Sequence, residues 1–371
     1  MKKQVKALVL LSGGLDSILA VKLLLEQGII VEAVNFRTNF CGPSKARLAA
    51  KMLGVNLREV NIRKDFLPIL KHPRHGYGTG LNPCIDCHAL MLKKAGEIMR
   101  AEGFDFIATG EVLGERPMSQ HKKALDIVAK DADIVGYLLR PLSAKLLEPT
   151  IAENEGVVDR ERLLNISGRS RKIQMALAEQ YGIKEYPTPA GGCALTQKGF
   201  ADRLRELMAN KSDFNSDDVD LVAIGRHFWV AVSCHPGLDP GSSISNEDMD
   251  SRFPSFACGF GRARRGNDRR ESGVQIILGR NQEENNILEN IAGQGDILVA
   301  PDNFVGPLAL VRGATFCHPE LGSGSQDKGS RNEFGMTEKD IIDKAKELIL
   351  QFSPKAKDLG KEDLRFKIKL I

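Results

Sequence analysis

The feature that most constrains the fold is the junction LVLLSGGLDSILAVKLLLEQG at residues 8–28. The apolar run from Val5 to Leu11 is typical of a strand that is buried on both faces. An apolar helix follows from Asp16 and is predicted to end at Gly28, and a second apolar strand runs from Ile29 to Phe36. Strand, helix and strand in this order form a βαβ unit, so the sequence predicts an α/β domain with a parallel sheet and crossover helices.

The glycines between the first strand and the helix are suited to holding an anion. Gly13 and Gly14 allow close backbone approach, and N–H groups at a helix start favour negative charge. The stretch is neither a Walker loop nor GxGxxG, and for the glycines alone a tight strand–helix turn with a capping serine is the alternative. SGGLDS as a whole resembles the pyrophosphate loop, SGGxDS, of the ATP-pyrophosphatase (PP-loop) superfamily.

That resemblance implies a Rossmann-like parallel sheet of the adenine-nucleotide α-hydrolase type and an enzyme that uses ATP and Mg²⁺ to form an adenylate and pyrophosphate. The loop would grip the β- and γ-phosphates, and Asp16 would also help to hold Mg²⁺. Asn35 ends the second strand, where the superfamily often contacts adenine, and a simple turn residue is the alternative. Thr109 and Gly110 belong to FDFIATGEVLG, residues 104–114, which resembles an apolar strand ending in an ATG turn near the nucleotide. The loop residues that carry the match are Ser12, Gly13, Gly14, Asp16 and Ser17.

A second motif indicates sulfur or metal chemistry. NPCIDCH, residues 82–88, places Cys84 and Cys87 at the start of a predicted helix, where thiols shift toward the thiolate. Half of a zinc knuckle is the alternative interpretation, but it needs a second pair of ligands and the sequence has no other CxxC. His88 is a further candidate ligand, although a lone histidine more often caps a helix or is solvated. Seven cysteines, an odd number, suit a reducing compartment better than a disulfide framework.

NPC..C resembles the cysteine motif of the tRNA 2-thiouridylases, and PTPAGGCALT around Cys193 resembles the site of their second cysteine. Similarity to these enzymes and to the catalytic domain of the 4-thiouridine synthetases covers about residues 5–200. It implies an ATP-dependent tRNA sulfurtransferase that adenylates a uridine carbonyl and replaces the oxygen with sulfur. The sulfur donor would be a cysteine desulfurase, a sulfur carrier or free sulfide. The catalytic residues that the resemblance implies are Cys87, Cys193, Cys84 and Asp16.

Two sulfur mechanisms stay open. In one, a cysteine carries a persulfide and a second cysteine resolves it as a disulfide. In the other, Cys84, Cys87 and Cys193 hold a 4Fe-4S cluster whose open iron binds hydrosulfide. The C-terminal β-barrel of the thiouridylases is not evident, and the ferredoxin-like and THUMP domains of the 4-thiouridine synthetases are expected to be absent. The position that is thiolated therefore stays open.

The remaining chain indicates RNA binding. Arg169, Arg171 and Lys172 would contact tRNA phosphates, with a solvated helix face as the alternative. Residues 219–230 and 274–291 alternate like strands, 295–313 adds two short strands, and EKDIIDKAKELILQF closes the chain as an amphipathic helix. GRN..EN and the closing VRG resemble the RNA-binding domain shared with the NFACT ribosome quality-control proteins. That resemblance implies RNA contacts at Arg280, Asn281 and Arg312, and an uncommitted small α+β domain is the alternative.

The expected organisation has three parts: a PP-loop domain at 1–150, a helical extension with the third cysteine motif at 151–210, and an NFACT-type domain at 211–371. Two stretches, at about 232–273 and 315–336, interrupt the last domain and resemble translated genomic repeat elements. Both carry CHPxL and a GS pair, lack periodicity and are expected to be disordered. On that interpretation three cysteines play no part in function: Cys234, Cys258 and Cys317.

Composition agrees with a soluble globular protein, since 42% of the residues are hydrophobic and the net charge is only +4. No apolar stretch reaches the roughly 20 residues that a membrane span needs, so we expect a cytoplasmic protein without a membrane partner. Two other functions remain as alternatives. One is a PP-loop enzyme that adenylates a small molecule, and the other is an RNA-binding quality-control factor with a degenerate nucleotide domain.

Overall fold

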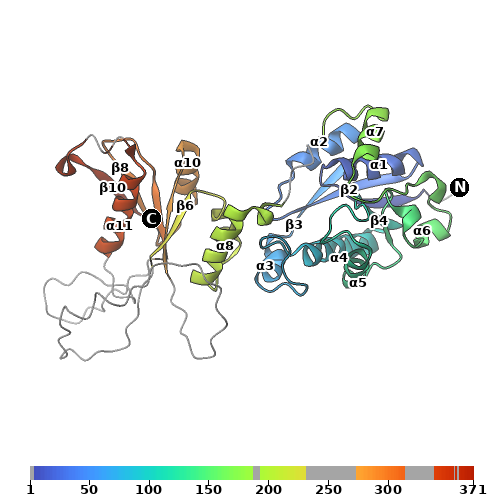
Figure 1. Ribbon diagram of the computed structural model, residues 1–371, viewed down its shortest axis with the longest axis horizontal. Coiled ribbons are helices and arrows are strands. Elements are labelled where there is room, and N and C mark those ends of the chain that lie inside the picture. Colours follow the sequence, from blue (N-terminus) through green and yellow to red (C-terminus); the bar gives the residue numbers. More distant parts are fainter. Residues whose placement is uncertain (1–3, 187–192, 231–272, 314–337, 355, 357–358) are drawn as a thin grey trace, which may run out of the picture. The chain divides into compact units, whose positions relative to one another are not determined.

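The computed structural model describes residues 4–186, 193–230, 273–313, 338–354, 356 and 359–371. The chain divides into two compact units, one made of residues 1–205 and 215–220 and the other of 206–214 and 221–371 (Figure 1). Apart from Gly273, the two segments predicted to be insertions lie outside the described residues, together with Cys234, Cys258 and Cys317. The PTPAGG stretch before Cys193 lies outside them as well.

The first unit is built on a five-stranded parallel sheet with the order β3-β2-β1-β4-β5. Leu10 of β1 lies beside Val34 of β2 and Thr109 of β4, so the carboxyl ends of these three strands meet at one edge. The strand order reverses at β1, and ligands of open α/β sheets bind at such a reversal. The predicted α/β class is confirmed. The strands are β1 (Lys6–Leu10), β2 (Ile30–Arg37), β3 (Asn56–Asn61), β4 (Phe106–Thr109) and β5 (Leu138–Leu139).

Helices cover both faces of this sheet, because alternate strand residues are apolar on each side. Ala7, Val9 and Ala33 pack in one cluster with α1, α2 and α7, whereas Leu8 and Val34 pack in another with α4 and α5. Figure 1 shows the two groups of helices on opposite sides of the strands. The helices are α1 (Leu15–Glu26), α2 (Ser44–Leu53), α3 (Arg63–Lys71), α4 (Cys84–Glu102), α5 (Lys122–Asp131), α6 (Ile151–Asn154) and α7 (Lys172–Gln180). Two more follow, α8 (Lys198–Asn210) and α9 (Ser216–Leu221).

The second unit contains a five-stranded antiparallel sheet with the order β10-β8-β9-β7-β6. One face packs against Leu288 of α10 (Gln282–Ile291), and the other against Ile341 and Ala345 of α11 (Glu338–Gln351). The predicted small α+β class and the amphipathic helix are confirmed, but the helix does not close the chain because β10 follows it. The strands are β6 (Arg226–Val230), β7 (Val274–Leu278), β8 (Ile297–Pro301), β9 (Ala309–Arg312) and β10 (Phe366–Leu370). In the described part of the chain, no helix combines the length and the apolar character that crossing a membrane requires.

Two strands of the second unit are shorter than the sequence pattern predicted. Residues 219–221 end α9, so β6 begins only at Arg226. The predicted strand at 274–291 is extended only as far as Leu278, and its second half forms α10. The helix forms because the Asn281 side chain accepts the N–H of Glu284 at 2.9 Å and caps its first turn.

Candidate active site

The glycine-rich loop lies at the carboxyl end of β1, where the strand order reverses. Gly13 adopts a left-handed φ of +79°, and a Cβ there would collide with the backbone of Lys45 in the first turn of α2. Gly14 precedes α1 in an extended conformation and offers no side-chain cap. The first turns of α1 and α2 therefore both lie at the loop, an arrangement that favours an anionic ligand.

Contacts within the loop explain its other predicted residues. Ser17 Oγ donates to the carbonyl oxygen of Gly14 at 2.8 Å and lies 3.2 Å from Ser12 Oγ. A Cβ at Gly110 would collide with the backbone of Asp16 and Ser17. Glycine is therefore required at position 110 because the turn after β4 packs directly against the first turn of α1.

Two predicted nucleotide contacts, Asn35 and Thr109, are buried beside this loop. Asn35 Nδ2 donates to the carbonyl oxygen of Leu11 at 2.8 Å, while its buried Oδ1 has no hydrogen-bond partner among the described residues. Thr109 Oγ1 donates to Glu111 Oε2 at 3.1 Å, so its hydroxyl is used inside the protein. Asn35 thus keeps an acceptor that an amino group on a ligand would satisfy, since buried polar atoms are usually paired.

Asp16 lies in a group of charged residues at the start of α1. Arg171 Nη2 lies 2.7 Å from Asp16 Oδ2, and Arg171 Nε lies 3.5 Å from Glu115 Oε1. Burial raises the pKa of Asp16 although Arg171 opposes it, and burial together with the Asp16 charge raises the pKa of Glu115. The buried Asp16 Oδ1 has no hydrogen-bond partner among the described residues. This unpartnered oxygen fits a divalent cation that also contacts phosphate oxygens.

The three basic residues predicted to contact tRNA lie in different surroundings. Arg169 and Lys172 are exposed, as phosphate contacts require. The Arg171 side chain is instead only 18% exposed and is engaged by Asp16 and Glu115. The structure therefore brings Arg171 to the glycine-rich loop, a position that the sequence pattern did not indicate.

The predicted thiols come together although more than a hundred residues separate them. Cys84 is the first residue of α4, and Cys87 lies in the same first turn. Cys193 immediately precedes a short 3-10 helix, η3 (Ala194–Thr196). Leu81 N donates to the carbonyl oxygen of Leu195 at 3.1 Å, which ties the Cys193 segment to the loop before Cys84.

Cys41 is a fourth thiol at this site and was not predicted from the sequence. It is exposed, lies in the loop between β2 and α2, and is hydrogen-bonded to the Cys193 thiol. No motif surrounds Cys41. It could have been inferred only from its position shortly after β2, because the carboxyl end of β2 lies at the sheet edge that carries the site. Cys87 and Cys193 are also close enough for their charges to interact.

The hydrogen bond between Cys193 and Cys41 shifts the pKa values of the two thiols in opposite directions. It is the largest influence on both groups: it lowers the pKa of Cys41 to about 6 and raises the pKa of Cys193. Burial raises the pKa of Cys84 and of Cys87. The prediction that the helix start turns Cys84 and Cys87 toward the thiolate is therefore wrong, because desolvation outweighs the helix start. Among these thiols, Cys41 is the one whose pKa is lowered.

Basic residues connect the thiols electrostatically with the loop. The exposed Arg116 lowers the pKa of Cys41 and Cys84, and it acts in the same direction on Asp16. Lys45, whose backbone adjoins Gly13, also lowers the pKa of Cys41. The loop and the thiols therefore share one electrostatic environment at the carboxyl edge of the sheet. Arg116 had not been singled out, because an isolated arginine after a turn forms no pattern.

A buried ion-pair group supports this edge. Arg140 Nε lies 2.8 Å from Glu111 Oε2, and His88 Nδ1 lies 2.8 Å from Glu111 Oε1. Although burial opposes ionisation, Arg140 and His88 hold the pKa of Glu111 well below its usual range. His88 is therefore neither a helix cap nor simply solvated: it fixes α4 against the turn that follows β4.

The arrangement of the thiols bears on the predicted iron–sulfur cluster, which needs a set of ligands around one metal site. Within the described ranges, no group of three or more histidine, cysteine, aspartate or glutamate side chains is arranged to hold a metal ion. As placed, Cys84, Cys87 and Cys193 do not fit a 4Fe-4S cluster.

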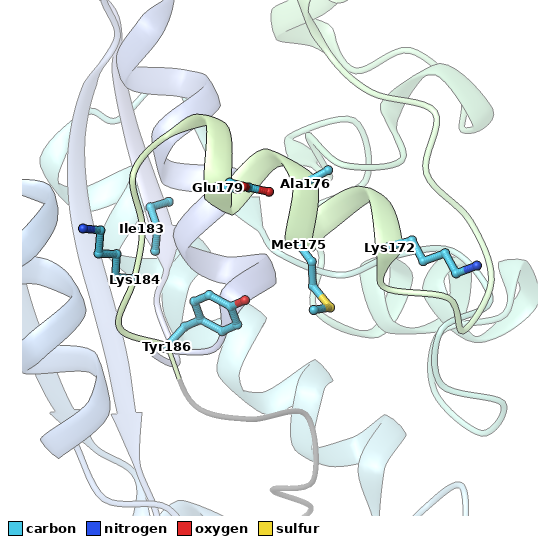
Figure 2. A pocket seen from close by; sticks show the side chains of 7 residues that line it. All are labelled: Lys172, Met175, Ala176, Glu179, Ile183, Lys184 and Tyr186. Carbon is cyan, nitrogen blue, oxygen red and sulfur yellow. The ribbon is translucent and has the colours of Figure 1, made fainter.

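A pocket of about 630 Å³ lies along α7 and contains neither the loop residues nor the thiols. Figure 2 shows Met175 and Tyr186 inside it, with Lys172 and Lys184 at opposite ends. Its lining residues are Lys172, Met175, Ala176, Glu179, Ile183, Lys184 and Tyr186. The pocket is thus separate from the chemical groups of the site.

The predicted RNA contacts of the second unit are engaged within the protein. Arg280 Nε donates to Glu284 Oε1 at 2.9 Å, and Asn281 caps α10. Arg312 Nη2 lies 2.6 Å from Asp296 Oδ2. An RNA contact by either arginine would therefore compete with an ion pair within this unit.

Comparisons with known proteins extend this picture of a parallel α/β unit with a glycine-rich loop and a group of thiols. Residues 2–146 match the family model described as thiamine biosynthesis protein (ThiI). The tRNA-specific 2-thiouridylase MnmA 1 of Syntrophus aciditrophicus is 30% identical over 233 residues, which cover 56% of each chain. The enzyme of the same type from Mannheimia succiniciproducens is 27% identical over 241 residues, or 60% of this chain and 58% of the relative.

The chain thus spans a little over half the length of these curated relatives. Among solved structures, a 4-thiouridine synthetase in complex with RNA and bound ATP aligns with a TM-score of 0.34 and 19% identity. That alignment covers 59% of this chain and 52% of the synthetase. In sequence, the chain is thus similar to the ThiI family model over residues 2–146 and to tRNA-specific 2-thiouridylases.

Proposed function

We propose that this protein is an ATP-dependent tRNA sulfurtransferase, which adenylates a uridine carbonyl and replaces its oxygen with sulfur to give 2-thiouridine or 4-thiouridine. The observation that carries the proposal is that the SGGLDS loop and the thiols share the carboxyl edge of one parallel sheet. Similarity to the ThiI family model and to tRNA-specific 2-thiouridylases supports it.

The loop would bind ATP so that the α-phosphate is open to attack. N–H groups at the start of α1 would hold the pyrophosphate portion, and the unpartnered Asn35 Oδ1 would accept a hydrogen bond from the adenine amino group. Asp16 would hold Mg²⁺, which when bound neutralises phosphate charge. The uridine oxygen then attacks the α-phosphorus, the bond to the pyrophosphate oxygen breaks, and correct positioning supplies most of the rate enhancement.

Sulfur transfer would follow at the neighbouring thiols. Cys193 is hydrogen-bonded to Cys41 and interacts electrostatically with Cys87. We assign the persulfide to Cys193: its outer sulfur attacks the activated carbon, and AMP leaves with the former carbonyl oxygen. Cys84 and Cys87 would contribute to receiving persulfide sulfur from a cysteine desulfurase or a persulfide-bearing sulfur carrier, whereas free sulfide, which is already fully reduced, would serve only the cluster mechanism. The cluster mechanism at Cys84, Cys87 and Cys193 remains a separate hypothesis, with its own test below.

The tRNA would be held by phosphate contacts, which position RNA without reading its sequence. Arg169 and Lys172 are exposed near the loop end of α7 and are proposed for this role. In the second unit, the NFACT-type interpretation assigns contacts to Arg280, Asn281 and Arg312.

Pyrophosphate release and nucleoside mass spectrometry test the proposal together. Purified protein with ATP and bulk tRNA should release pyrophosphate faster than without tRNA, and with a persulfide donor it should produce one thiolated uridine. Cys193→Ser should abolish thiolation but spare pyrophosphate release, whereas Asp16→Asn should abolish both. Pyrophosphate release that tRNA does not stimulate, but a small molecule does, would support the small-molecule alternative instead. No release at all would favour the quality-control factor.

A further inference from the structure

We propose that Cys41 is the resolving thiol of this site: it attacks Cys193 Sγ, frees the thiolated product and leaves a Cys41–Cys193 disulfide. The inference rests on the proposed function for its substrate, but the pairing of the two thiols does not depend on that substrate. Neither the sequence motifs nor the similarity to known proteins assigns a role to Cys41.

The loop that carries Cys41 is held on several sides. The Phe40 ring packs edge-on between Phe66 of α3 and Phe200 of α8, with ring centroids 5.7 and 5.6 Å away. Asn39 Nδ2 donates to the carbonyl oxygen of Ser216 at 2.7 Å. Contacts of the two residues that precede Cys41 therefore hold the backbone next to it.

The opposing thiol is held equally well. Thr196 N and Thr196 Oγ1 both donate to the carbonyl oxygen of Cys193, at 2.9 and 2.7 Å. Leu195 accepts from Leu81 N at 3.1 Å, and α8 with Phe200 begins directly after this turn. Because Phe200 also contacts Phe40, one packing unit carries both cysteines. Two thiols in hydrogen-bond contact on one packing unit are neighbours, as disulfide formation requires.

Cys41 is better placed as the resolving group than either cysteine of the CxxC pair. It is the thiol that hydrogen-bonds to Cys193, whereas Cys87 interacts with Cys193 only through charge. It is also exposed, while Cys84 and Cys87 are only partly accessible. An external dithiol can therefore reach a disulfide that contains Cys41, and access is a requirement for thiol–disulfide exchange.

The step balances in atoms and electrons. When the outer sulfur of the Cys193 persulfide has displaced AMP, Cys193 Sγ is joined through that sulfur to the uridine carbon. The Cys41 thiolate attacks Cys193 Sγ, and the bond between Sγ and the outer sulfur breaks. Its electron pair goes to the sulfur on the base, which becomes the thiocarbonyl. The two cysteines are oxidised to a disulfide, and a protein or small-molecule dithiol returns them to thiols and is itself oxidised.

The test is a reaction without external thiol, followed by peptide mapping under non-reducing conditions. Wild-type protein preloaded with persulfide should release about one equivalent of thiolated tRNA per chain and then contain the Cys41–Cys193 disulfide. Cys41→Ser should release none: its tRNA should remain attached to Cys193 until dithiothreitol frees it as thiolated tRNA. Cys317→Ser, which alters a cysteine of a predicted insertion, is the matched control and should behave as wild type.

A Cys84–Cys193 or Cys87–Cys193 disulfide in wild-type protein, or normal product release by Cys41→Ser, would overturn the proposal. Mild oxidation of wild-type protein by diamide, without tRNA, keeps the pairing testable if the variant does not fold or the proposed function fails. The Cys41–Cys193 disulfide should be the major product, and another major pairing would count against the inference. Failure of thiolation alongside that disulfide would contradict the proposed function while leaving the thiol pairing intact.

Discussion

Arg171 Nη2 lies 2.7 Å from Asp16 Oδ2, and this ion pair joins the start of α7 to the glycine-rich loop across 155 positions of the sequence. Both side chains are only 18% exposed, so solvent screens the pair less than it screens a surface ion pair. Arg171 therefore acts on the carboxylate proposed to hold Mg²⁺, and its role differs from that of the exposed basic residues around it.

Arg171→Gln and Arg169→Gln should consequently have different effects. The first should reduce ATP-dependent pyrophosphate release strongly while leaving tRNA affinity nearly unchanged, because it disturbs Asp16. The second should weaken tRNA binding and lower the slope of log affinity against log salt by about one, with little effect on release at saturating tRNA. Filter binding at several salt concentrations and a pyrophosphate assay measure the two properties. Equal loss of tRNA affinity in both variants would refute the distinction.

The Cys41 thiol should titrate at unusually low pH. The hydrogen bond from Cys193 lowers the pKa of Cys41 to about 6, and a thiol reacts with iodoacetamide as its thiolate. Alkylation of Cys41 should therefore rise with pH through a midpoint near 6 and level off above it. Cys193→Ala removes the hydrogen bond, so the midpoint should move upward toward the ordinary cysteine range. Peptide mass spectrometry after timed alkylation gives the midpoint, and an unchanged value in Cys193→Ala would exclude the hydrogen bond as its cause.

The effect of alanine should differ between two glycines that share a left-handed φ. At Gly28 a Cβ would meet open space, so Gly28→Ala should cost only the left-handed penalty of about 1 kcal/mol. At Gly13 the Cβ would also collide with the Lys45 backbone, so Gly13→Ala should cost more and should abolish pyrophosphate release. Urea denaturation gives the free energy of unfolding of each variant. Equal stability and full activity of Gly13→Ala would show that α2 does not approach the loop this closely.

The sequence revealed the parts of this site that are local in the chain. SGGLDS and NPCIDC each contain their chemistry within a few residues, and the apolar runs around them predicted β1, α1 and β2 well. Cys41, Arg116 and Arg171 were missed or misassigned because the parallel sheet brings them to the loop from separate segments. Thiol acidity was mispredicted for a related reason, since burial depends on the tertiary packing around α4.

In the second unit, local rules competed with each other. The alternation in VQIIL was extended into residues 282–291, but the cap at Asn281 and a single buried residue, Leu288, make that stretch a helix. The same Asn281 had been assigned to RNA, although a capping role explains an asparagine before a polar helix equally well. β10 was not predicted, because FKIKL is short and its partner β8 lies more than sixty residues earlier.

Iron analysis separates the two sulfur mechanisms. In the described part of the chain the thiols do not form a ligand set for a metal ion, while Cys41 and Cys193 are paired with each other. We therefore expect protein purified without oxygen to be colourless and to thiolate tRNA fully with a persulfide donor. Because soft thiolates bind iron–sulfur clusters tightly, a cluster that takes part in the reaction would survive such a purification. A brown protein with about four irons per chain, whose thiolation is lost on exposure to air and regained on cluster reconstitution, would establish the cluster mechanism instead.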